Sequence, residues 1–284
     1  MSTVKGIMQK PITIENSLML SNVIHKFIET KKSRLLTTNS QGKIVGIITQ
    51  KDIGFFLFVN NTEKTLDEIS VSEISRPLIE VSESTPIEDA AHIMYTKKIG
   101  SVGVSFSDTV GIVTKTDLTK YYYQNFVGYK KIGDAMTVSY SAMYEDDKLC
   151  QILQKMLSDK VSRLVIKDKE NNATGVVSFG DVFRISARLG QEKEVLDNSD
   201  PAISVIFPRK GFLSESGFGG TISAKDVMSN SIKSVDYNDD LVSACSEMLD
   251  NEINGCGVLI NGKLSGIVSK TDVIKILSEL RNQK

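Results

Sequence analysis

A short motif that combines a glycine, a hydroxyl and a carboxylate occurs four times along this chain of 284 residues. It reads Gly, two β-branched aliphatic residues, Thr or Ser, two variable residues, and Asp. The hydroxyl and carboxylate pairs of the four copies are Thr49 and Asp52, Thr114 and Asp117, Ser178 and Asp181, and Ser269 and Asp272. Successive aspartates are 65, 64 and 91 positions apart. Such spacing indicates duplication of a larger unit.

The chemistry of the motif suits either a ligand or a helix cap. At a junction between a strand and a helix, the first helical amides are unpaired and the helix dipole attracts anions. A Thr or Ser hydroxyl there can donate to a phosphate oxygen, and an Asp one turn later can accept from the two hydroxyls of a ribose. The same residue types are good helix caps, and a repeated fold would repeat its caps. The residues alone leave both interpretations open.

The same order of predicted elements surrounds each motif. A short β-like stretch comes first, at residues 11–14, 78–81, 138–140 and 232–235. An amphipathic helical pattern follows, as in Leu241, Ala244, Cys245 and Met248. A hairpin comes next, most clearly around the Asn-Gly turn at 261–262, where both residues must tolerate positive φ. The motif ends this hairpin and begins a second helix, for example 118–123 or 273–280, so each unit reads β-α-β-β-α.

A methionine keeps register with the motif. Met8, Met136 and Met228 precede the Asp of their own copy by 44 or 45 positions, and Ser75 holds the matching place in the second copy. We therefore expect repeats at about 1–60, 68–127, 129–190 and 220–284. A unit of about 55 residues buries too little surface to be comfortably stable alone. We expect the units to pair into two modules, 1–128 and 129–284, with the aromatic cluster at 121–126 packing the junction.

The last connection is longer than the other two. The 91-residue interval leaves about 26 extra residues before the fourth copy, within 191–220. This segment is rich in Gly and Ser and has no counterpart in the other connections. We predict an inserted loop there that is mobile or faces a partner.

Composition excludes several classes of function. The formal net charge of −1 argues against a protein that grips nucleic acid through its phosphates. No run of about 18 apolar residues predicts a membrane span, and the first ten residues lack the apolar core of a signal peptide. The three cysteines and two histidines are scattered, without zinc or disulfide spacing. We expect a cytoplasmic protein that is not an enzyme, because no catalytic pairing of side chains is visible.

The β-α-β-β-α unit, the methionine-bearing approach and the Gly-h-h-Thr/Ser-x-x-Asp turn resemble the cystathionine-β-synthase (CBS) domain. All four repeats match, and their layout is similar to that of the gamma subunit of AMP-activated protein kinase. The resemblance implies an α/β fold of four tandem CBS repeats paired into two modules. It implies a non-catalytic regulatory protein that binds AMP, ADP or ATP, requires no cofactor, signals to a protein partner and forms a homodimer. The alternatives are a structural interaction module without a physiological nucleotide, or a sensor of another adenosyl ligand such as S-adenosylmethionine.

The resemblance also assigns roles to residues. The motif Asp would hold the ribose, the motif Thr or Ser would contact phosphate, and the partner domain would supply an adenine wall and a basic residue. The four predicted sites are Asp117 and Thr114 with Pro11, Ile12 and Arg34; Asp272 and Ser269 with Val138 and Arg163; Asp52 and Thr49 with Pro77, Leu78 and Ser101; and Asp181 and Ser178 with Ser231, Ile232 and Gly255.

The four sites should not be equal. The second and fourth motifs read Lys-Thr-Asp, which places Lys115 and Thr116, or Lys270 and Thr271, beside the phosphate site. Each of these two sites would also receive an arginine, which can grip phosphate with two donors. The other two motifs read Gln-Lys-Asp and Phe-Gly-Asp. We therefore predict tighter nucleotide binding at Asp117 and Asp272 than at Asp52 and Asp181.

Overall fold

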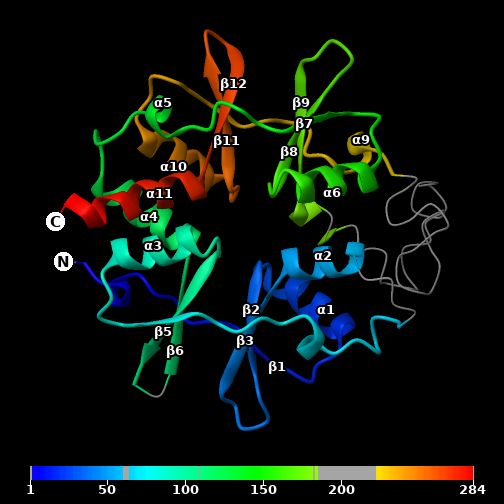
Figure 1. The fold of residues 1–284 in the computed structure, drawn as a ribbon, viewed down its shortest axis with the longest axis vertical. Helices are drawn as coiled ribbons and strands as arrows, with labels where there is room; N and C mark the ends of the chain where they lie inside the picture. Colours follow the sequence, from blue (N-terminus) through cyan, green and yellow to red (C-terminus); the bar gives the residue numbers. More distant parts are fainter. Residues whose placement is uncertain (1, 60–63, 108, 182, 185–221, 284) are drawn as a thin grey trace. The chain divides into compact units, whose positions relative to one another are not determined.

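The structure is a computed structural model that describes residues 2–59, 64–107, 109–181, 183–184 and 222–283 (Figure 1). It confirms the predicted α/β class, with four repeats that each carry a three-stranded sheet beside helices. In every sheet the first strand runs parallel to the second, and the second runs antiparallel to the third. The predicted insert at 191–220 lies outside the described residues.

The first two repeats have the same elements in the same order. Repeat 1 comprises β1 (Thr13–Glu15), α1 (Leu20–Thr30), β2 (Arg34–Thr38), β3 (Ile44–Thr49) and α2 (Gln50–Val59). Repeat 2 comprises β4 (Glu80–Ser82), α3 (Ile87–Thr96), β5 (Ser101–Phe106), β6 (Thr109–Thr114) and α4 (Lys115–Asn125).

The last two repeats follow the same plan. Repeat 3 comprises β7 (Ala142–Tyr144), α6 (Leu149–Ser158), β8 (Arg163–Lys167) and β9 (Ala173–Ser178), after which helical residues begin at Phe179. Repeat 4 comprises β10 (Ser234–Asp236), α10 (Leu241–Asp250), β11 (Gly255–Ile260), β12 (Lys263–Ser269) and α11 (Lys270–Glu279), which η3 (Leu280–Gln283) extends.

The first helix of every repeat buries its apolar face in one register. Each of these helices places buried residues at its first, fourth, fifth and eighth positions, a spacing that aligns them on one face. The buried residues are Leu20, Val23, Ile24 and Phe27 in α1; Ile87, Ala90, Ala91 and Met94 in α3; Leu149, Ile152, Leu153 and Met156 in α6; and Leu241, Ala244, Cys245 and Met248 in α10.

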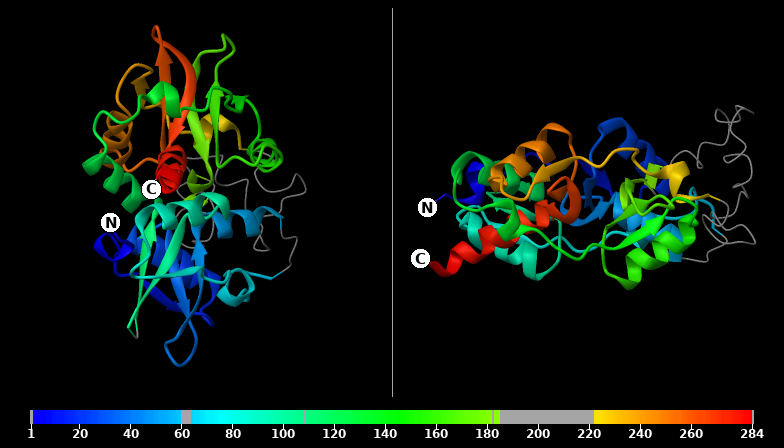
Figure 2. Two further views of the ribbon diagram at one scale, coloured as in Figure 1. Left: turned by 60° about the vertical axis from the view of Figure 1, so that its left-hand side comes forward. Right: turned by 90° about the horizontal axis from the view of Figure 1, so that it is seen from above.

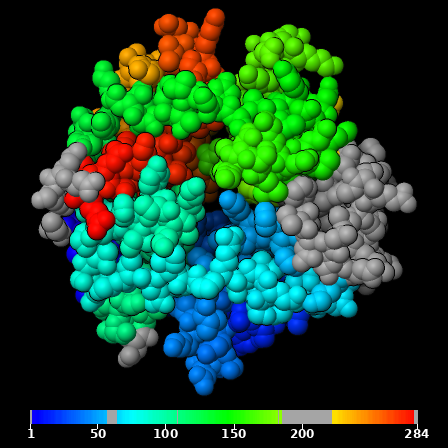
Figure 3. Space-filling model, in the orientation of Figure 1, coloured from blue at the N-terminus to red at the C-terminus, as the bar shows by residue number. Residues whose placement is uncertain are grey.

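The predicted hairpin of repeat 4 is confirmed, whereas one predicted strand was wrong. Asn261 and Gly262 join β11 to β12 with φ values of 51° and 75°, and the hairpin tip stands in the open (orange at the top of Figure 3). The stretch 138–140 is not a strand; β7 lies four residues later, at 142–144. The residue before that stretch, Thr137, instead forms an isolated bridge with Ile267, so this segment belongs to the approach of the chain rather than to a sheet of repeat 3.

The approach segments, which precede the first strand of each repeat, are exchanged between neighbouring repeats. The segment around η1 (Val4–Gly6) packs on repeat 2, where Gln9 and Ile112 bond each other's backbone at 2.9 Å. The segment around η2 (Val71–Glu73) packs on repeat 1, where Arg76 bridges Ile47. In the same way α5 (Ile132–Ala135) packs on repeat 4 and α9 (Ala224–Val227) on repeat 3. Met8, which precedes repeat 1, therefore contacts repeat 2, and Met136, which precedes repeat 3, contacts repeat 4.

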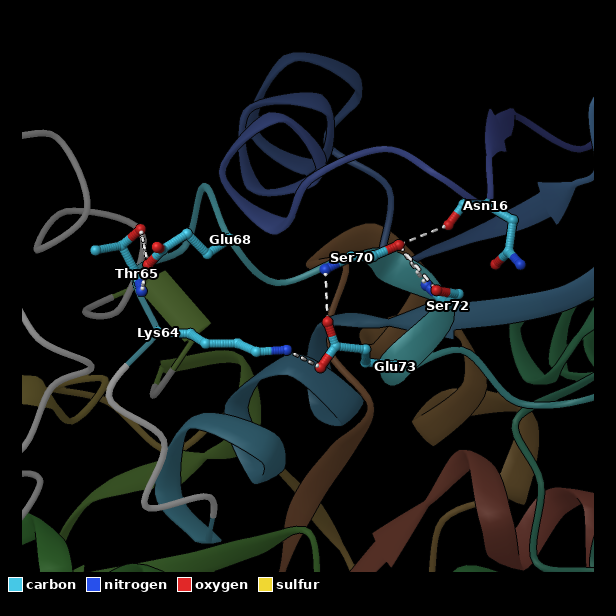
Figure 4. A network of polar contacts seen from close by, with 7 residues as sticks. All are labelled: Asn16, Lys64, Thr65, Glu68, Ser70, Ser72 and Glu73. Carbon is cyan, nitrogen blue, oxygen red and sulfur yellow. Dashed lines mark hydrogen bonds and ion pairs between the residues drawn. The ribbon is translucent and has the colours of Figure 1, made fainter.

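Polar side chains fix the exchanged segment of η2 (Figure 4). Ser70 and Glu73 form a capping box, in which the Ser70 amide donates to Glu73 Oε1 at 3.1 Å and the Ser72 amide donates to Ser70 Oγ at 3.3 Å. Lys64 Nζ donates to Glu73 Oε2 at 2.9 Å, and Ser70 Oγ donates to the Asn16 carbonyl at 3.1 Å. The Lys64 ammonium and the Ser70 amide hold the pKa of Glu73 below its usual value.

The exchanged segment crosses directly over the glycine of each motif, where a side chain would clash with it. A Cβ on Gly175 would lie 2.6 Å from the Ser229 carbonyl oxygen, and one on Gly266 would lie 2.8 Å from the Thr137 carbonyl oxygen. On Gly111 it would lie 2.8 Å from Met8 Sδ. Contacts this short leave no room for a side chain unless the backbone of the crossing segment shifts or, at Gly111, the Met8 side chain moves aside. The motif glycine and the distant methionine thus form one packing feature.

The chain divides into two compact units. Unit 1 comprises residues 1–11, 78–140 and 232–284, and unit 2 comprises residues 12–77 and 141–231. Each unit combines one repeat from each half of the chain, so the units do not coincide with the ranges 1–128 and 129–284. Those ranges describe a pairing along the chain, which stays a prediction.

Each unit has its own apolar core. In unit 1, α11 packs against α3 and α4, and α10 packs against α4 (Figures 1 and 2). Tyr122 is fully buried there and stacks on Phe126 with ring centroids 5.0 Å apart. In unit 2, the Phe27 ring of α1 meets the Phe183 ring edge-on at 5.5 Å. No helix within the described ranges is long and apolar enough to cross a membrane.

Candidate functional site

All four motifs occupy the junction predicted for them, between the last strand of a repeat and the helix that follows. Thr49 ends β3, Thr114 ends β6, Ser178 ends β9 and Ser269 ends β12. The next residue begins a helix in each case. The motif Asp therefore lies in the first turn of that helix, three positions after the hydroxyl residue.

In every copy the side chain of the motif Asp accepts from the Thr or Ser that precedes the helix, and in repeats 1, 2 and 4 the bonds are reciprocal, as in a capping box. The backbone amide of the Thr or Ser donates to Oδ2 of the motif Asp, at 3.0, 2.8, 2.7 and 2.7 Å in repeats 1 to 4. The hydroxyl donates to the same oxygen at 2.6 Å in all four copies. The capping interpretation is thus confirmed, and it uses one carboxylate oxygen. The other oxygen, Oδ1, takes no part in these bonds.

In repeats 1 and 3 an arginine of the protein pairs with that second oxygen. Arg76 pairs with Oδ1 of Asp52, and Arg184 pairs with Oδ1 of Asp181. These two aspartates are buried, with 5% and 4% of their surface exposed. Partial burial and the charge of Arg76 lower the pKa of Lys51, the residue before Asp52. Sequence reasoning missed both arginines, although Arg184 follows its Asp by one helical turn.

In repeats 2 and 4 the two motifs contact each other inside unit 1. Lys115 Nζ donates to Thr271 Oγ1 at 2.7 Å, and Lys270 Nζ donates to Thr116 Oγ1 at 3.0 Å. Lys270 is only 4% exposed. The aspartates of these motifs, unlike those of repeats 1 and 3, are half-buried. Two lysines therefore lie at the N-termini of α4 and α11, each bonded to the threonine of the other motif. The Lys-Thr-Asp sequence that the two motifs share did not predict this contact between them.

The predicted basic residues lie at the start of the hairpins. Arg34 is in register opposite Thr49, and Arg163 is opposite Ser178. The corresponding residues in repeats 2 and 4 are Ser101, opposite Thr114, and Gly255, opposite Ser269. The predicted contributions of Arg34 to the Asp117 site and of Arg163 to the Asp272 site join residues of different units and stay predictions.

The predicted adenine-wall residues precede the first strand of each repeat. Ile12 is half-buried, and its carbonyl accepts from the Leu36 amide at 2.9 Å, which attaches it to β2. Leu78 and Ile232 are half-buried and lie close to the glycine of the neighbouring strand in their repeat. The remaining members of this set are Pro11, which is half-buried, and Pro77, Val138 and Ser231, which are exposed. Among the described residues, no group of three or more acidic, His or Cys side chains has an arrangement that could hold a metal ion.

Two proteins of one archaeon are similar to this chain in sequence. Protein MJ1426 of Methanocaldococcus jannaschii is 27% identical over 180 residues, which are 63% of this chain and 88% of the relative. Protein MJ1404 of the same organism is 23% identical over 204 residues, 71% of this chain but only 45% of MJ1404. The chain thus matches less than half the length of that relative.

A solved structure shares the fold of the whole chain. Protein MJ1225 of M. jannaschii, described as a candidate archaeal homologue of g-AMPK, has a TM-score of 0.78 at 19% identity. The likeness covers 97% of this chain and 99% of that one. The model of the CBS domain matches residues 4–57, 71–124, 132–188 and 224–279, one segment for each repeat. Because these segments make up most of its length, the chain belongs to the CBS domain family, whose domains are regulatory ligand-binding modules.

Proposed function

We propose that this protein is a non-catalytic regulatory protein that binds adenine nucleotides, and that its preferred binding motifs are those of Asp117 and Asp272. The observation that carries the proposal is the reciprocal contact of these two motifs, in which Lys115 reaches Thr271 and Lys270 reaches Thr116. Two ammonium groups and the N-termini of two helices meet there, and each of these attracts a phosphate.

The carboxylates supply the second half of the recognition. Asp117 and Asp272 each direct Oδ2 at their cap and are half-buried, so a ligand hydroxyl pair has access to the motif. Nucleotides are among the compounds that offer both a vicinal diol and a phosphate, and the membership of the chain in the CBS domain family favours them over simple sugar phosphates. We therefore propose AMP, ADP or ATP as the ligand. The proposed set also includes the other residues that the sequence predicts for the two sites, namely Thr114, Ser269, Pro11, Ile12, Arg34, Val138 and Arg163.

Calorimetric titration of the full chain with AMP, ADP and ATP tests the proposal. Asp117→Asn and Asp272→Asn keep the shape of the cap but remove the charge that accepts the diol. We expect each to weaken one class of site at least tenfold, which corresponds to about 1.4 kcal/mol. Asp52→Asn is the matched control and should leave these affinities unchanged. Loss of binding in the control with retention in the other two variants would contradict the assignment.

A second pair of variants identifies the ligand class. S-adenosylmethionine presents the same ribose diol but no phosphate. Lys115→Met with Lys270→Met should therefore weaken AMP strongly while leaving adenosine and S-adenosylmethionine nearly unaffected. Equal loss for AMP and adenosine would refute the phosphate role of the lysines. If the unmodified chain binds none of these compounds at millimolar concentration, the alternative of a structural interaction module replaces the proposal.

The proposal extends to assembly. The exchange of approach segments takes place between repeats 1 and 2 and between repeats 3 and 4, which supports modules at 1–128 and 129–284. We propose that ligand occupancy is signalled from these modules to a protein partner, and that the chain forms a homodimer in the cytoplasm. Light scattering with and without AMP measures the mass of the assembly, and a monomeric mass under both conditions would refute the dimer.

A further inference from the structure

Two of the four motif carboxylates, those of Asp52 and Asp181, are paired with an arginine of the protein. Oδ2 of Asp52 accepts from the amide and the hydroxyl of Thr49, at 3.0 and 2.6 Å, and Oδ1 is paired with Arg76. Asp181 repeats this arrangement, with Ser178 at Oδ2 and Arg184 at Oδ1. Both oxygens of each carboxylate are thus engaged, and both aspartates are buried.

The backbone of Arg76 is fixed in a position that has an equivalent in every repeat. Its amide and carbonyl bond the Ile47 backbone at 2.9 and 2.8 Å, in the exchanged segment that crosses the motif strand. The residues that make the same bridge to the other three motif strands are Gln9, Ser229 and Thr137. Of these four positions only that of repeat 1 carries a cation. The arginine is therefore a feature of this repeat and not of the fold.

In repeat 3 the arginine that pairs with the motif Asp comes from the helix after the motif, and not from the crossing segment. Arg184 lies three positions after Asp181, on the helix that the motif begins. The corresponding residues are Phe55, Lys120 and Lys275, of which Lys275 pairs with Glu279 instead. Two unrelated positions thus deliver a guanidinium to the motif carboxylate in the two repeats whose aspartates are buried.

A guanidinium and a vicinal diol compete for the same acceptor. Each would donate to Oδ1, the oxygen that the cap does not use, and an arginine pair is charge-assisted, which makes it roughly twice as strong as a neutral hydrogen bond. We infer that Arg76 and Arg184 are internal occupants of the diol-binding carboxylates, and that they restrict ligand binding to the motifs of Asp117 and Asp272. This inference rests on the proposed function for the identity of the ligand.

Apart from their contact with the aspartates, the side chains of the two arginines are largely exposed to solvent. The side chains of Arg76 and Arg184 are 62% and 65% exposed, whereas those of their aspartates are 6% and 5% exposed. Replacing either arginine therefore removes little packing and leaves the cap of the motif in place. Arg76→Gln is the natural choice, because Gln9 occupies the equivalent position in repeat 2.

Native mass spectrometry of the full chain with AMP, combined with calorimetry, counts the sites. We expect two bound AMP molecules in the unmodified chain and three in Arg76→Gln, with affinity at the Asp52 motif raised at least tenfold. The double variant Arg76→Gln with Asp52→Asn should return the count to two, which locates the gained site. Arg76→Lys keeps a cation in place and should gain less than Arg76→Gln.

The number of sites in the two proteins distinguishes failure of the inference from failure of the proposed function. Two sites in both the unmodified chain and Arg76→Gln would overturn the inference alone, as would three or more sites in the unmodified chain. No site in the unmodified chain but one in Arg76→Gln would support the inference and overturn the preference for Asp117 and Asp272. No binding to either protein would overturn both.

Discussion

Replacing the motif glycine by alanine should destabilise repeat 3 strongly and repeat 2 only weakly. The reason is that a backbone oxygen lies above the glycine in repeat 3, whereas a methionine side chain lies above it in repeat 2. In Gly175→Ala the new Cβ meets the Ser229 carbonyl oxygen at 2.6 Å, and that oxygen is backbone. The exchanged segment must lift, which weakens the Val176–Ser229 bridge with its bonds of 3.3 and 3.0 Å. In Gly111→Ala the three nearest atoms all belong to the Met8 side chain. A methionine has three rotatable bonds and can move aside.

The magnitudes follow from these contacts. Two backbone hydrogen bonds contribute about 1 kcal/mol each, and overpacking costs about 1 to 3 kcal/mol. Replacing glycine by alanine also stiffens the unfolded chain, which offsets about 0.4 to 1 kcal/mol. We therefore expect Gly175→Ala to destabilise the crossing of residues 222–229 by about 2 to 4 kcal/mol. The corresponding effect of Gly111→Ala on residues 3–9 should stay below about 1 kcal/mol.

Hydrogen exchange of the full chain, followed by mass spectrometry, measures the two crossings separately. Because about 1.4 kcal/mol is a factor of ten, Gly175→Ala should speed exchange in peptides covering 222–229 by roughly thirtyfold or more. Gly111→Ala should change peptides covering 3–9 by less than about fivefold. Equal effects in the two variants, or a larger effect at Gly111, would refute the distinction between backbone and side-chain neighbours.

Three further predictions concern single residues. Burial raises the pKa of the Cys245 thiol to about 12, so a thiol reagent at pH 8 should label the half-buried Cys150 first and Cys245 only after denaturation; prompt labelling of Cys245 would contradict its burial. Gly262 has φ of 75° with open space around it, so Gly262→Ala should destabilise the hairpin by about 1 kcal/mol and Gly262→Asn by less, measured by thermal unfolding; equal costs would argue against backbone conformation as the cause. Lys64 helps to hold the pKa of Glu73 low, so the stabilisation from Glu73 is present near neutral pH and is lost as pH falls through its folded pKa; the stability difference between the unmodified chain and Glu73→Gln should therefore shrink on acidification, and a constant difference would refute the linkage.

Much of the fold could be predicted from local pattern. The apolar spacing of α10 and the Asn-Gly turn before β12 are local signals, and both elements lie where the pattern indicates. The motif position at the strand-to-helix junction was predictable for the same reason. The first strand of repeat 3 was predicted four residues too early. The short stretch after Met136 has strand-like composition, but it follows the segment that crosses β12 at Ile267 and does not join the sheet of repeat 3.

The candidate site was predicted only in part, because its decisive contacts are not local. The hydroxyl and carboxylate residues follow from the repeat. The contact of Arg76 with Asp52 depends on an exchange of segments that no spacing within one copy reveals. The contact of Lys115 with Thr271 joins residues 156 positions apart and depends on how α4 and α11 pack. Arg184 could have been found by examining the helix face that carries Asp181.

The crossing of approach segments also constrains the order in which the chain can fold as it is synthesised. Gln9 completes its bridge only with Ile112, about a hundred positions later, so the segment around Gln9 leaves the ribosome well before the hairpin that it pairs with. Contacts of such long sequence separation slow folding, since a large loop must close before they form. The smallest stretch that can mature during translation is therefore a pair of repeats and not a single one. For the same reason, a gene that gained or lost one copy would leave a strand-crossing segment without its acceptor, which favours growth of the array by pairs.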